Sequence, residues 1–398
     1  MSTRLSYRTV LSSPGAARLL ASALYARLPL GMTALSILLV VRSSTGSIAA
    51  AGIVVGAYAL GNAATAPVQG VLVDRYGQLR VLVPSSVIQA SLLITLLLAA
   101  RSHLATGVLV VIAALAGVAL PPFSAAARAL WRFVLHEPEQ LEAFYSLDAV
   151  TQEAIWIVSP LIVSALVAVA SPAAALLLCA AISITGGINF CATPASRSWH
   201  SDGAARRRGG ALASRPLRFL LCSIVSTGCA WGCLTVGLPA LAVHLGTARY
   251  AGILLALVSV GSLCGGLAYS RRAWVAPLER RYAIALAVIA LSALPLCLAG
   301  NLRTAAPLAV LLGLGWAPAL SCQYALVGRA APAGSVMEAF TWQTSGFVGG
   351  ASIGAAIGGA LAGAAGPRTV FAVLSASALA AAVIATSARN RINAGART

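Results

Sequence analysis

The sequence predicts an all-helical membrane protein whose twelve transmembrane helices form two six-helix bundles. Three observations predict this fold class: the apolar composition, the length of the apolar runs, and a repeat between the two halves. Hydrophobic residues make up 59% of the chain and charged residues 9%, whereas about a quarter of the residues are charged in a typical soluble domain. A soluble fold could not bury this much apolar surface, so we place the chain in a lipid bilayer.

The apolar runs set the number of helices. A helix needs roughly 20 apolar residues to cross a bilayer, and the chain contains twelve runs of about this length. We expect spanning helices over residues 15–41, 48–69, 79–100, 104–127, 143–169, 172–192, 217–243, 248–269, 281–300, 305–327, 338–363 and 367–388.

The two halves of the chain match each other at a constant offset of 196 residues. Three ungapped pairs of segments carry the match: GVLVDRYGQLR (70–80) with GLAYSRRAWVA (266–276), GVALPPFSAAARAL (117–130) with GLGWAPALSCQYAL (313–326), and LEAFYSLDA (141–149) with MEAFTWQTS (337–345). Three separate matches without a gap indicate that a six-helix unit was duplicated.

The repeat defines the expected domains. We expect an N-terminal six-helix bundle over residues 1–190, a cytoplasmic linker over 191–216 and a C-terminal six-helix bundle over 217–398. The linker is polar, is rich in Gly and Ser, and carries the run Arg206–Arg208. Parallel repeats of this kind place a substrate site near the midplane between the bundles, which is the architecture of a secondary transporter.

The basic residues exclude one energy source. All 27 are Arg, and the chain has no Lys, so it lacks the lysine that a phosphate-binding P-loop needs. Uphill transport would therefore depend on an ion gradient or on a partner ATPase. We expect no cofactor and no metal site. An enzyme is not expected either, because no paired His/Asp cluster or nucleophile–base pair is found.

The distribution of Arg predicts the topology. With the N-terminus inside, 21 Arg residues fall on the cytoplasmic side and five, Arg249 among them, on the outer side. Such a bias in short loops sets orientation, so we expect both termini in the cytoplasm. The net charge of +18 is then a topology signal that also attracts anionic lipid, and we expect no nucleic-acid partner.

The loop between the second and third predicted helices carries Gly70, Asp74, Arg75, Gly77 and Arg80. This spacing resembles the signature that transporters of the major facilitator superfamily carry at the same place, and the resemblance extends over essentially the whole chain. It implies a transporter of two six-helix bundles that works by alternating access.

The same loop is expected to form a latch between the bundles. Gly77 permits a tight turn that a Cβ atom would strain, and Asp74 can pair with Arg128 or Arg132 at the inner end of helix four. The resemblance also implies that Asp74 faces the start of helix eleven near Glu338, where the helix dipole favours an anion. Glu338 could repel Asp74 or share its Arg partners. The alternative is a loop whose charges face water and only set topology.

Three charged residues lie where charge is costly in a membrane and are therefore functional candidates. Arg27 lies about twelve residues into helix one, and Glu153 about eleven residues in from Glu142, so we expect both near mid-depth; Asp148 lies shallower. Our preferred hypothesis is that Glu153 pairs with Arg27 in one state and binds a proton in another. The alternatives are a permanent structural salt bridge and Asp148 as the proton site.

Polar and aromatic residues in the predicted helices are candidates for the substrate cavity. They are Tyr25, Trp156, Gln323, Tyr324, Trp342 and Gln343, with Thr344, Trp231 and Trp316 as further candidates. Each of them could instead make ordinary interhelical hydrogen bonds or pack at an interface. The second-half stripe of Gly350, Gly354 and Gly358 is expected to pack helices closely rather than to bind a ligand.

The leading functional expectation is proton-coupled export of a small lipophilic organic compound or metabolite. A cavity poor in charge, with scattered aromatic residues, favours such a substrate. Drug–proton antiporters of the superfamily carry Gly-Pro on helix five, and Ser159-Pro160 departs from that motif, which weakens the antiporter assignment. The alternatives are a proton-coupled importer of a small nutrient, in which Arg27 binds a substrate anion, and a non-transporting receptor on the same fold. We expect a monomer in a bacterial plasma membrane.

Overall fold

A computed structural model describes residues 15–135, 137–199, 210–246, 250–271 and 274–395, without the side chains of residues 48, 49 and 387–395. Every regular element in this part of the chain is helical. Arg206–Arg208 and Arg249, which the sequence assigned to the linker and to an outer loop, lie outside the described residues.

The first half of the chain forms α2 (Ala16–Thr45), α3 (Ile48–Tyr76), α4 (Gln78–Arg101), α5 (Thr106–Val118), α6 (Phe123–Val134), α7 (Pro138–Val169), α8 (Pro172–Cys191) and the short α9 (Pro194–Ser198). The second half forms η1 (Gly210–Ala213), α10 (Arg215–His244), α11 (Ala251–Arg271), α12 (Leu278–Ala293), η3 (Leu294–Leu298), α13 (Leu302–Gly313), α14 (Trp316–Ala330), α15 (Val336–Ala365) and α16 (Pro367–Gly395). Twelve segments of the described chain are helical, long and apolar enough to cross a membrane, which confirms the predicted number of spans.

Two of these spans, one in each half, are interrupted. The first runs over Thr106–Val134 and breaks between α5 and α6, where Pro121 and Pro122 stand. Proline has no backbone N–H to donate within a helix, so this pair ends one helix and begins the next. The second runs over Leu302–Ala330 and breaks between α13 and α14, in the segment that the 196-residue offset aligns with the first.

The two bundles repeat the same helix pairs. In the first, α2 packs on α8 and α3 on α5; in the second, α10 packs on α16 and α11 on α13. The repeat-related Gly117 and Gly313 explain the close approach: a Cβ there would lie 2.0 Å from the Tyr58 carbonyl oxygen and 2.2 Å from that of Val258. The duplication visible in the sequence is therefore also a duplication of packing.

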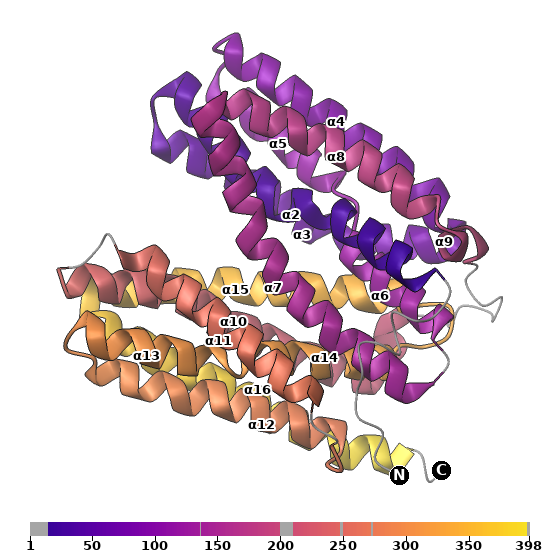
Figure 1. The fold of residues 1–398 in the computed structure, drawn as a ribbon, viewed down its shortest axis with the longest axis vertical. Coiled ribbons are helices and arrows are strands. Elements are labelled where there is room, and N and C mark those ends of the chain that lie inside the picture. Colours follow the sequence, from indigo (N-terminus) through magenta and orange to yellow (C-terminus); the bar gives the residue numbers. More distant parts are fainter. Residues whose placement is uncertain (1–14, 136, 200–209, 247–249, 272–273, 396–398) are drawn as a thin grey trace.

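Contacts between the bundles follow the repeat as well. Helix α15 packs on α3 and α6 of the first bundle, and α7 packs on α11 and α14 of the second. The bundles lie close together at the end where α6 and α9 are found and diverge toward the other end (Figure 1). We call the first the Asp74 end, because α3 finishes there, and the second the opposite end.

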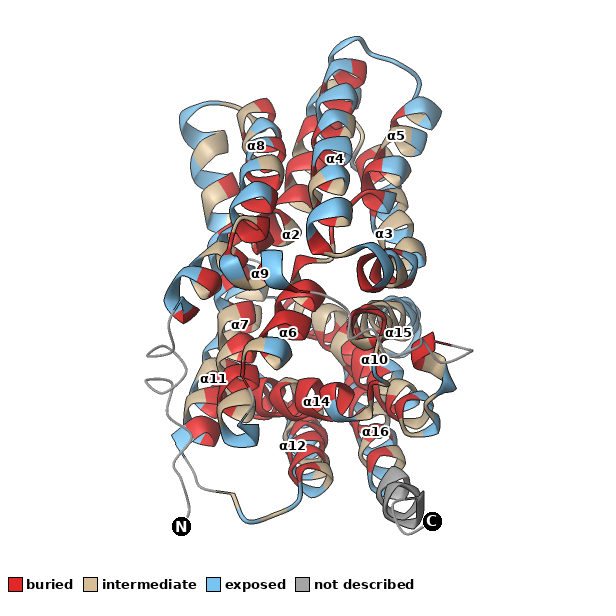
Figure 2. Cartoon of the chain, turned by 90° about the vertical axis from the view of Figure 1, so that its right-hand side faces the viewer, coloured by how far each residue is buried: buried red, intermediate tan, exposed pale blue. Residues whose placement is uncertain are grey.

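Burial follows this arrangement. Helices α6 and α14 lie at the centre of the molecule and are mostly buried, whereas α4 and α5 expose one side (Figure 2). Large apolar side chains such as Ile53, Leu60 and Leu161 are exposed. Such exposed apolar faces are those expected for helices that contact lipid rather than water.

Candidate functional site: the cavity between the bundles

Asp74 joins the two bundles at the Asp74 end. Its Oδ2 atom accepts a hydrogen bond from the backbone N–H of Glu338 at 2.8 Å, and Oδ1 accepts one from Met337 at 3.2 Å. The first N–H groups of a helix have no partner within it, and the positive end of the helix dipole favours a carboxylate there. Asp74 thus lies at the start of α15, where the resemblance implied.

Two glycines make this contact possible. Gly77 adopts φ +88° between α3 and α4, a backbone conformation that a Cβ would strain. A Cβ on Gly70 would lie 2.3 Å from Thr341 Oγ1, so the missing side chain allows α3 to approach α15. Arg75 and Arg80, the two Arg residues of the same loop, are exposed.

The Glu338 side chain is directed toward the segment that precedes α10. A Cβ on Gly210, in η1, would lie 2.5 Å from Glu338 Oε2. The backbone N–H of Glu338 meets Asp74 while its carboxylate lies against the η1 backbone. Glu338 therefore makes two different contacts, one to Asp74 through its backbone and one to η1 through its side chain.

A second set of contacts at this end was not predicted. Glu142 on α7 accepts hydrogen bonds from Arg281 on α12 at 3.0 Å and from Arg329 on α14 at 2.7 Å. Arg132 donates to the carbonyl oxygen of Gly328. The sequence offered one signal, the alignment of Glu142 with Glu338, but it did not identify the Arg partners because they lie in the other half of the chain.

Deeper in the first bundle, two guanidinium groups share one carboxylate. Arg27 Nη1 lies 2.5 Å from Asp148 Oδ1, and Arg128 Nε lies 2.7 Å from Asp148 Oδ2. The three residues are 0–3% exposed. This corrects two expectations: in this conformation Arg27 pairs with Asp148 rather than with Glu153, and Arg128 belongs to this cluster rather than to the latch.

The helical geometry of α7 explains the different pairing. The helix begins at Pro138, five residues before the predicted start. Five residues correspond to about 140° around a helix, so Asp148 and Glu153 face different neighbours. Glu153 is buried and accepts a hydrogen bond at 3.2 Å from Ser262, on α11 of the second bundle.

A cavity of about 430 Å³ lies between the bundles. Six of the predicted candidates for substrate contact line it: Trp156, Trp231, Trp316, Tyr324, Gln343 and Thr344. Glu153 lines it as well, and the other lining residues are Leu30, Asn62, Ser124, Arg128, Gln152, Thr235, Leu320, Phe347, Val348, Ala351, Ser352 and Ala355. The volume falls within the range of small-molecule sites.

Three predicted cavity residues have other surroundings. Tyr25 is hydrogen-bonded to Thr185 on α8 at 2.9 Å. Gln323 is buried and accepts a hydrogen bond from Tyr282 at 3.4 Å, and Trp342 packs against the apolar core. None of the three is among the residues that line the large cavity, because each points from its helix toward a neighbour in its own bundle or toward the core.

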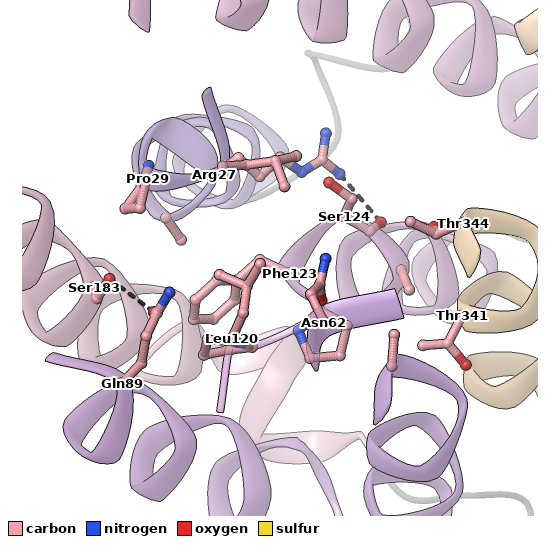
Figure 3. Close-up of a pocket in the computed structure, with 16 residues that line it drawn as sticks. Arg27, Pro29, Asn62, Gln89, Leu120, Phe123, Ser124, Ser183, Thr341 and Thr344 are labelled. Atoms are coloured by element: carbon pink, nitrogen blue, oxygen red, sulfur yellow. Dashed lines mark hydrogen bonds between the residues drawn. The ribbon is translucent and has the colours of Figure 1, made fainter. Parts of the chain in front are cut away.

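A smaller cavity of about 50 Å³ adjoins the large one and shares Leu30, Asn62, Ser124 and Thr344 with it. Arg27 lines only the smaller one, where its Nη2 atom lies 3.4 Å from the Ser124 carbonyl oxygen (Figure 3). The cation that lines the large cavity is therefore Arg128, a residue that sequence reasoning assigned to another role.

The comparison with protein families fits this geometry. The family description "Major Facilitator Superfamily" matches residues 19–340, a range that includes the Asp74 loop, the ion cluster and most of the cavity. The chain belongs to the Major Facilitator Superfamily. No curated protein matches it at a significant level.

Solved structures with the same fold belong to other transporters of this superfamily. A bacterial homologue of the iron transporter ferroportin in an outward-facing state has 16% identity and a TM-score of 0.76, covering 94% of this chain and 99% of that one. The E. coli fucose:proton symporter has 14% identity and a TM-score of 0.70, covering 95% and 99%. The human organic anion transporter MFSD10 has 15% identity and a TM-score of 0.68, covering 92% and 99%. At these identities the likeness establishes the fold.

Proposed function

We propose that this superfamily member is a proton-coupled secondary transporter that moves a small amphipathic organic compound through the central cavity. The observation that carries the proposal is the position of Glu153. It is 4% exposed and lines the cavity, and its one hydrogen-bond donor among the described residues is Ser262 of the opposite bundle. A buried carboxyl without an ion-pair partner is suited to gain and lose a proton, because burial disfavours its charged form.

Asp148 is less suited to this role. Both of its oxygens accept hydrogen bonds from guanidinium groups. Protonating Asp148 would leave two buried cations without their counter-ion, which is strongly unfavourable. We therefore assign Asp148 to a lasting structural cluster and Glu153 to the proton.

The contact between Glu153 and Ser262 provides a route for coupling. Transporters of this architecture work by rocking one bundle against the other around a fixed site. Glu153 is on the first bundle and Ser262 is on the second, so rocking changes the surroundings of the carboxyl. With the Asp74 end in the cytoplasm, as the Arg bias predicts, the present conformation is closed inside and the Asp74 contact must break for inward opening.

The cavity supports an amphipathic substrate. Trp156, Trp231, Trp316 and Phe347 supply aromatic surface, in keeping with the lipophilic compound and export that the sequence favours. The second candidate, proton-coupled uptake, is favoured by one observation: Arg128 lines the same cavity. The fold serves both an organic anion transporter and a proton symporter among the similar structures. We retain a monomer in a bacterial plasma membrane as part of the proposal.

Proton movement in liposomes tests the proposal. Purified protein is reconstituted with a pH-sensitive dye inside and exposed to ethidium, chloramphenicol and p-toluenesulfonate, with protein-free liposomes as the leak control. Compound-dependent proton movement in the wild type, lost in Glu153→Gln and kept in Glu139→Gln, is the expected result. Glu139 is an exposed acid on the same helix. Proton movement that persists in Glu153→Gln would refute the assigned proton site.

A further inference from the structure

The ion cluster of Arg27, Arg128 and Asp148, beside the large cavity, carries a net charge. Arg27 and Arg128 carry two positive charges against the single negative charge of Asp148, and all three are buried. The cluster therefore has one excess positive charge, in surroundings where an uncompensated charge is costly. Two of the residues that line the cavity are charged, and they are Arg128 and Glu153.

Arg128 has donor capacity left for a ligand. Its Nε atom donates to Asp148 and Nη1 donates to Gln343 Oε1 at 3.3 Å. Within the described part of the chain no acceptor is placed on Nη2. Tyr324 lies against the guanidinium, with the Arg128 Cζ atom 3.6 Å from the ring centroid. The group is thus held in one orientation, and its planar donors suit a carboxylate or sulfonate.

Two further buried donors in the cavity wall have no hydrogen-bond partner among the described residues. They are Gln152 Nε2 and Trp316 Nε1, and both residues line the cavity and are at least 93% buried, with exposed fractions of 7% and 0%. A buried donor without an acceptor is unfavourable. Together with Arg128 they supply three donor groups to the cavity wall, which suits a ligand that carries acceptors.

The rest of the cavity wall limits the ligand to one acid group. Apart from Arg128 and Glu153, its lining is neutral, and Trp156, Trp231, Trp316 and Phe347 offer apolar surface. A second acid group on the ligand would find no cation there. The chemistry fits a monoanion with an aromatic or aliphatic body.

We propose that the central cavity binds an amphipathic organic monoanion whose acid group sits on Arg128, and that one proton, carried by Glu153, moves with it. The second part rests on the proposed proton coupling. With Glu153 ionised and no ligand, the groups Arg27, Arg128, Asp148 and Glu153 sum to zero. With Glu153 protonated and a monoanion bound, the sum is again zero, so each state is free of uncompensated charge.

The groups that face Glu153 fit this exchange. Ser262 of α11 is its hydrogen-bond donor, and Arg128 of α6 and Tyr324 of α14 line the same cavity. A bound anion on Arg128 repels an ionised Glu153 and so favours its protonated form. Anion and proton then travel in the same direction, so an inward proton gradient drives uptake. This proposal therefore adopts the second candidate, proton-coupled uptake, in place of export.

Ligand binding tests the anion site without transport. Detergent-purified protein is titrated with phenylacetate, phenylacetamide and 2-phenylethylammonium, which share one carbon skeleton and differ in charge, while tryptophan fluorescence and thermal stability are recorded. Phenylacetate is expected to bind saturably and to stabilise the protein, and the amide and the cation are expected to bind far more weakly. Equal binding of the three, or no binding of phenylacetate at millimolar concentration, would overturn the proposal.

Variants assign the site to Arg128. Arg128→Met is expected to weaken phenylacetate binding at least about 30-fold, as for loss of one partner of a buried charge pair, and Arg128→Lys, which keeps the charge, to weaken it less. Arg303→Gln, an exposed Arg at the opposite end, serves as the matched control. Unchanged binding in both Arg128 variants would overturn the site. If Arg128→Met does not fold, the comparison of the three ligands on the wild type still tests the anion site.

Flux measurements test the joint movement. Proteoliposomes take up labelled p-toluenesulfonate, whose neutral acid does not form at neutral pH, while the membrane potential is set with potassium and valinomycin. Proton uptake with the sulfonate and a rate independent of potential support electroneutral co-movement; sulfonate uptake without protons, or a rate that follows the potential, overturns it. If co-movement fails, anion binding to Glu153→Gln distinguishes the two proposals. Binding that survives in this variant leaves the anion site standing and assigns the failure to the proposed proton coupling.

Discussion

The Glu153 carboxylate and the Ser262 hydroxyl meet across the boundary between the two bundles. Ser262 donates to Glu153 Oε1 at 3.2 Å, and both side chains are buried. The contact joins α7 to α11, and α15 and α3 form the repeat-related contact. Gly349 stands at the position that corresponds to Glu153, so the fold is duplicated but the acid is confined to one half.

Asp148 and Glu153 are predicted to differ in their importance for stability. Asp148→Asn removes the counter-ion of two buried guanidinium groups, so we expect it to lower the free energy of unfolding by about 3–5 kcal/mol. Glu153→Gln replaces an acid that has no ion-pair partner among the described residues and is expected to change stability little. Denaturant unfolding of both variants in the same detergent checks the contrast, and equal losses would contradict it.

Asp74 is predicted to hold the Asp74 end closed. Asp74→Asn removes the charge that faces the first turn of α15 and is expected to weaken the contact by about 0.5–2 kcal/mol. The population closed at the opposite end should then rise. Ser270→Ala, at the repeat-related position, is the matched control and is expected to change the populations less.

Distances between spin labels report these populations. Labels on Ser102 and Asn301, both exposed at the opposite end, are expected to come closer together in Asp74→Asn than in the wild type. The exposed Cys222 and Cys264 are first replaced so that they do not react. An unchanged distance distribution in Asp74→Asn would show that this contact does not hold the conformation.

The two Arg partners of Glu142, Arg281 and Arg329, are predicted to contribute unequally to the stability of the protein. The Arg281 side chain is 7% exposed and donates from two nitrogens, whereas the Arg329 side chain is 55% exposed. Water screens an exposed pair, so Arg329→Gln is expected to cost about 0–1 kcal/mol of stability. Arg281→Gln breaks the more buried pair and is expected to cost about 3–5 kcal/mol. Unfolding measurements that rank the two variants in the reverse order would be inconsistent with this arrangement.

Neighbouring glycines on α15 are predicted to respond differently to the same substitution. A Cβ on Gly350 would lie 2.0 Å from the Val225 carbonyl oxygen, whereas one on Gly349 would meet nothing within 4 Å. Gly350→Ala is therefore expected to destabilise by about 1–3 kcal/mol, and Gly349→Ala to be neutral or to stabilise by up to about 1 kcal/mol. Thermal unfolding in detergent checks the pair; similar melting temperatures would count against close packing of α10 on α15.

The fold could be predicted from the sequence because its determinants are local or repeated. Apolar run length identifies spans residue by residue, and the 196-residue offset reports the duplication without any knowledge of contacts. The glycine stripe on α15 is another local pattern that predicted structure. Its spacing predicted close packing, and a Cβ on Gly350 or Gly354 would lie 2.0 Å from a carbonyl oxygen of α10. Helix ends were less predictable, since α7 begins at Pro138 rather than at residue 143.

The site was only partly predictable because pairing depends on depth and on helix rotation. Position in the sequence gave Arg27 and Glu153 similar depths, but it did not give the rotation of α7, and the partner of Arg27 is Asp148. Arg128 was assigned to the latch from its place near the inner end of helix four, but it points to the cavity and to Tyr324. Asp74 was easier, because a spacing motif fixes its position in the chain.

The most direct test of proton coupling at Glu153 compares net accumulation with exchange in one variant. Proteoliposomes carrying wild type or Glu153→Gln are given labelled p-toluenesulfonate, either with an inward proton gradient or with unlabelled sulfonate inside and no gradient. Exchange requires no net proton movement, so Glu153→Gln is predicted to exchange near the wild-type rate while gradient-driven accumulation is lost. Accumulation that persists in Glu153→Gln, or exchange that is lost together with accumulation, would contradict the role of Glu153 as the proton carrier.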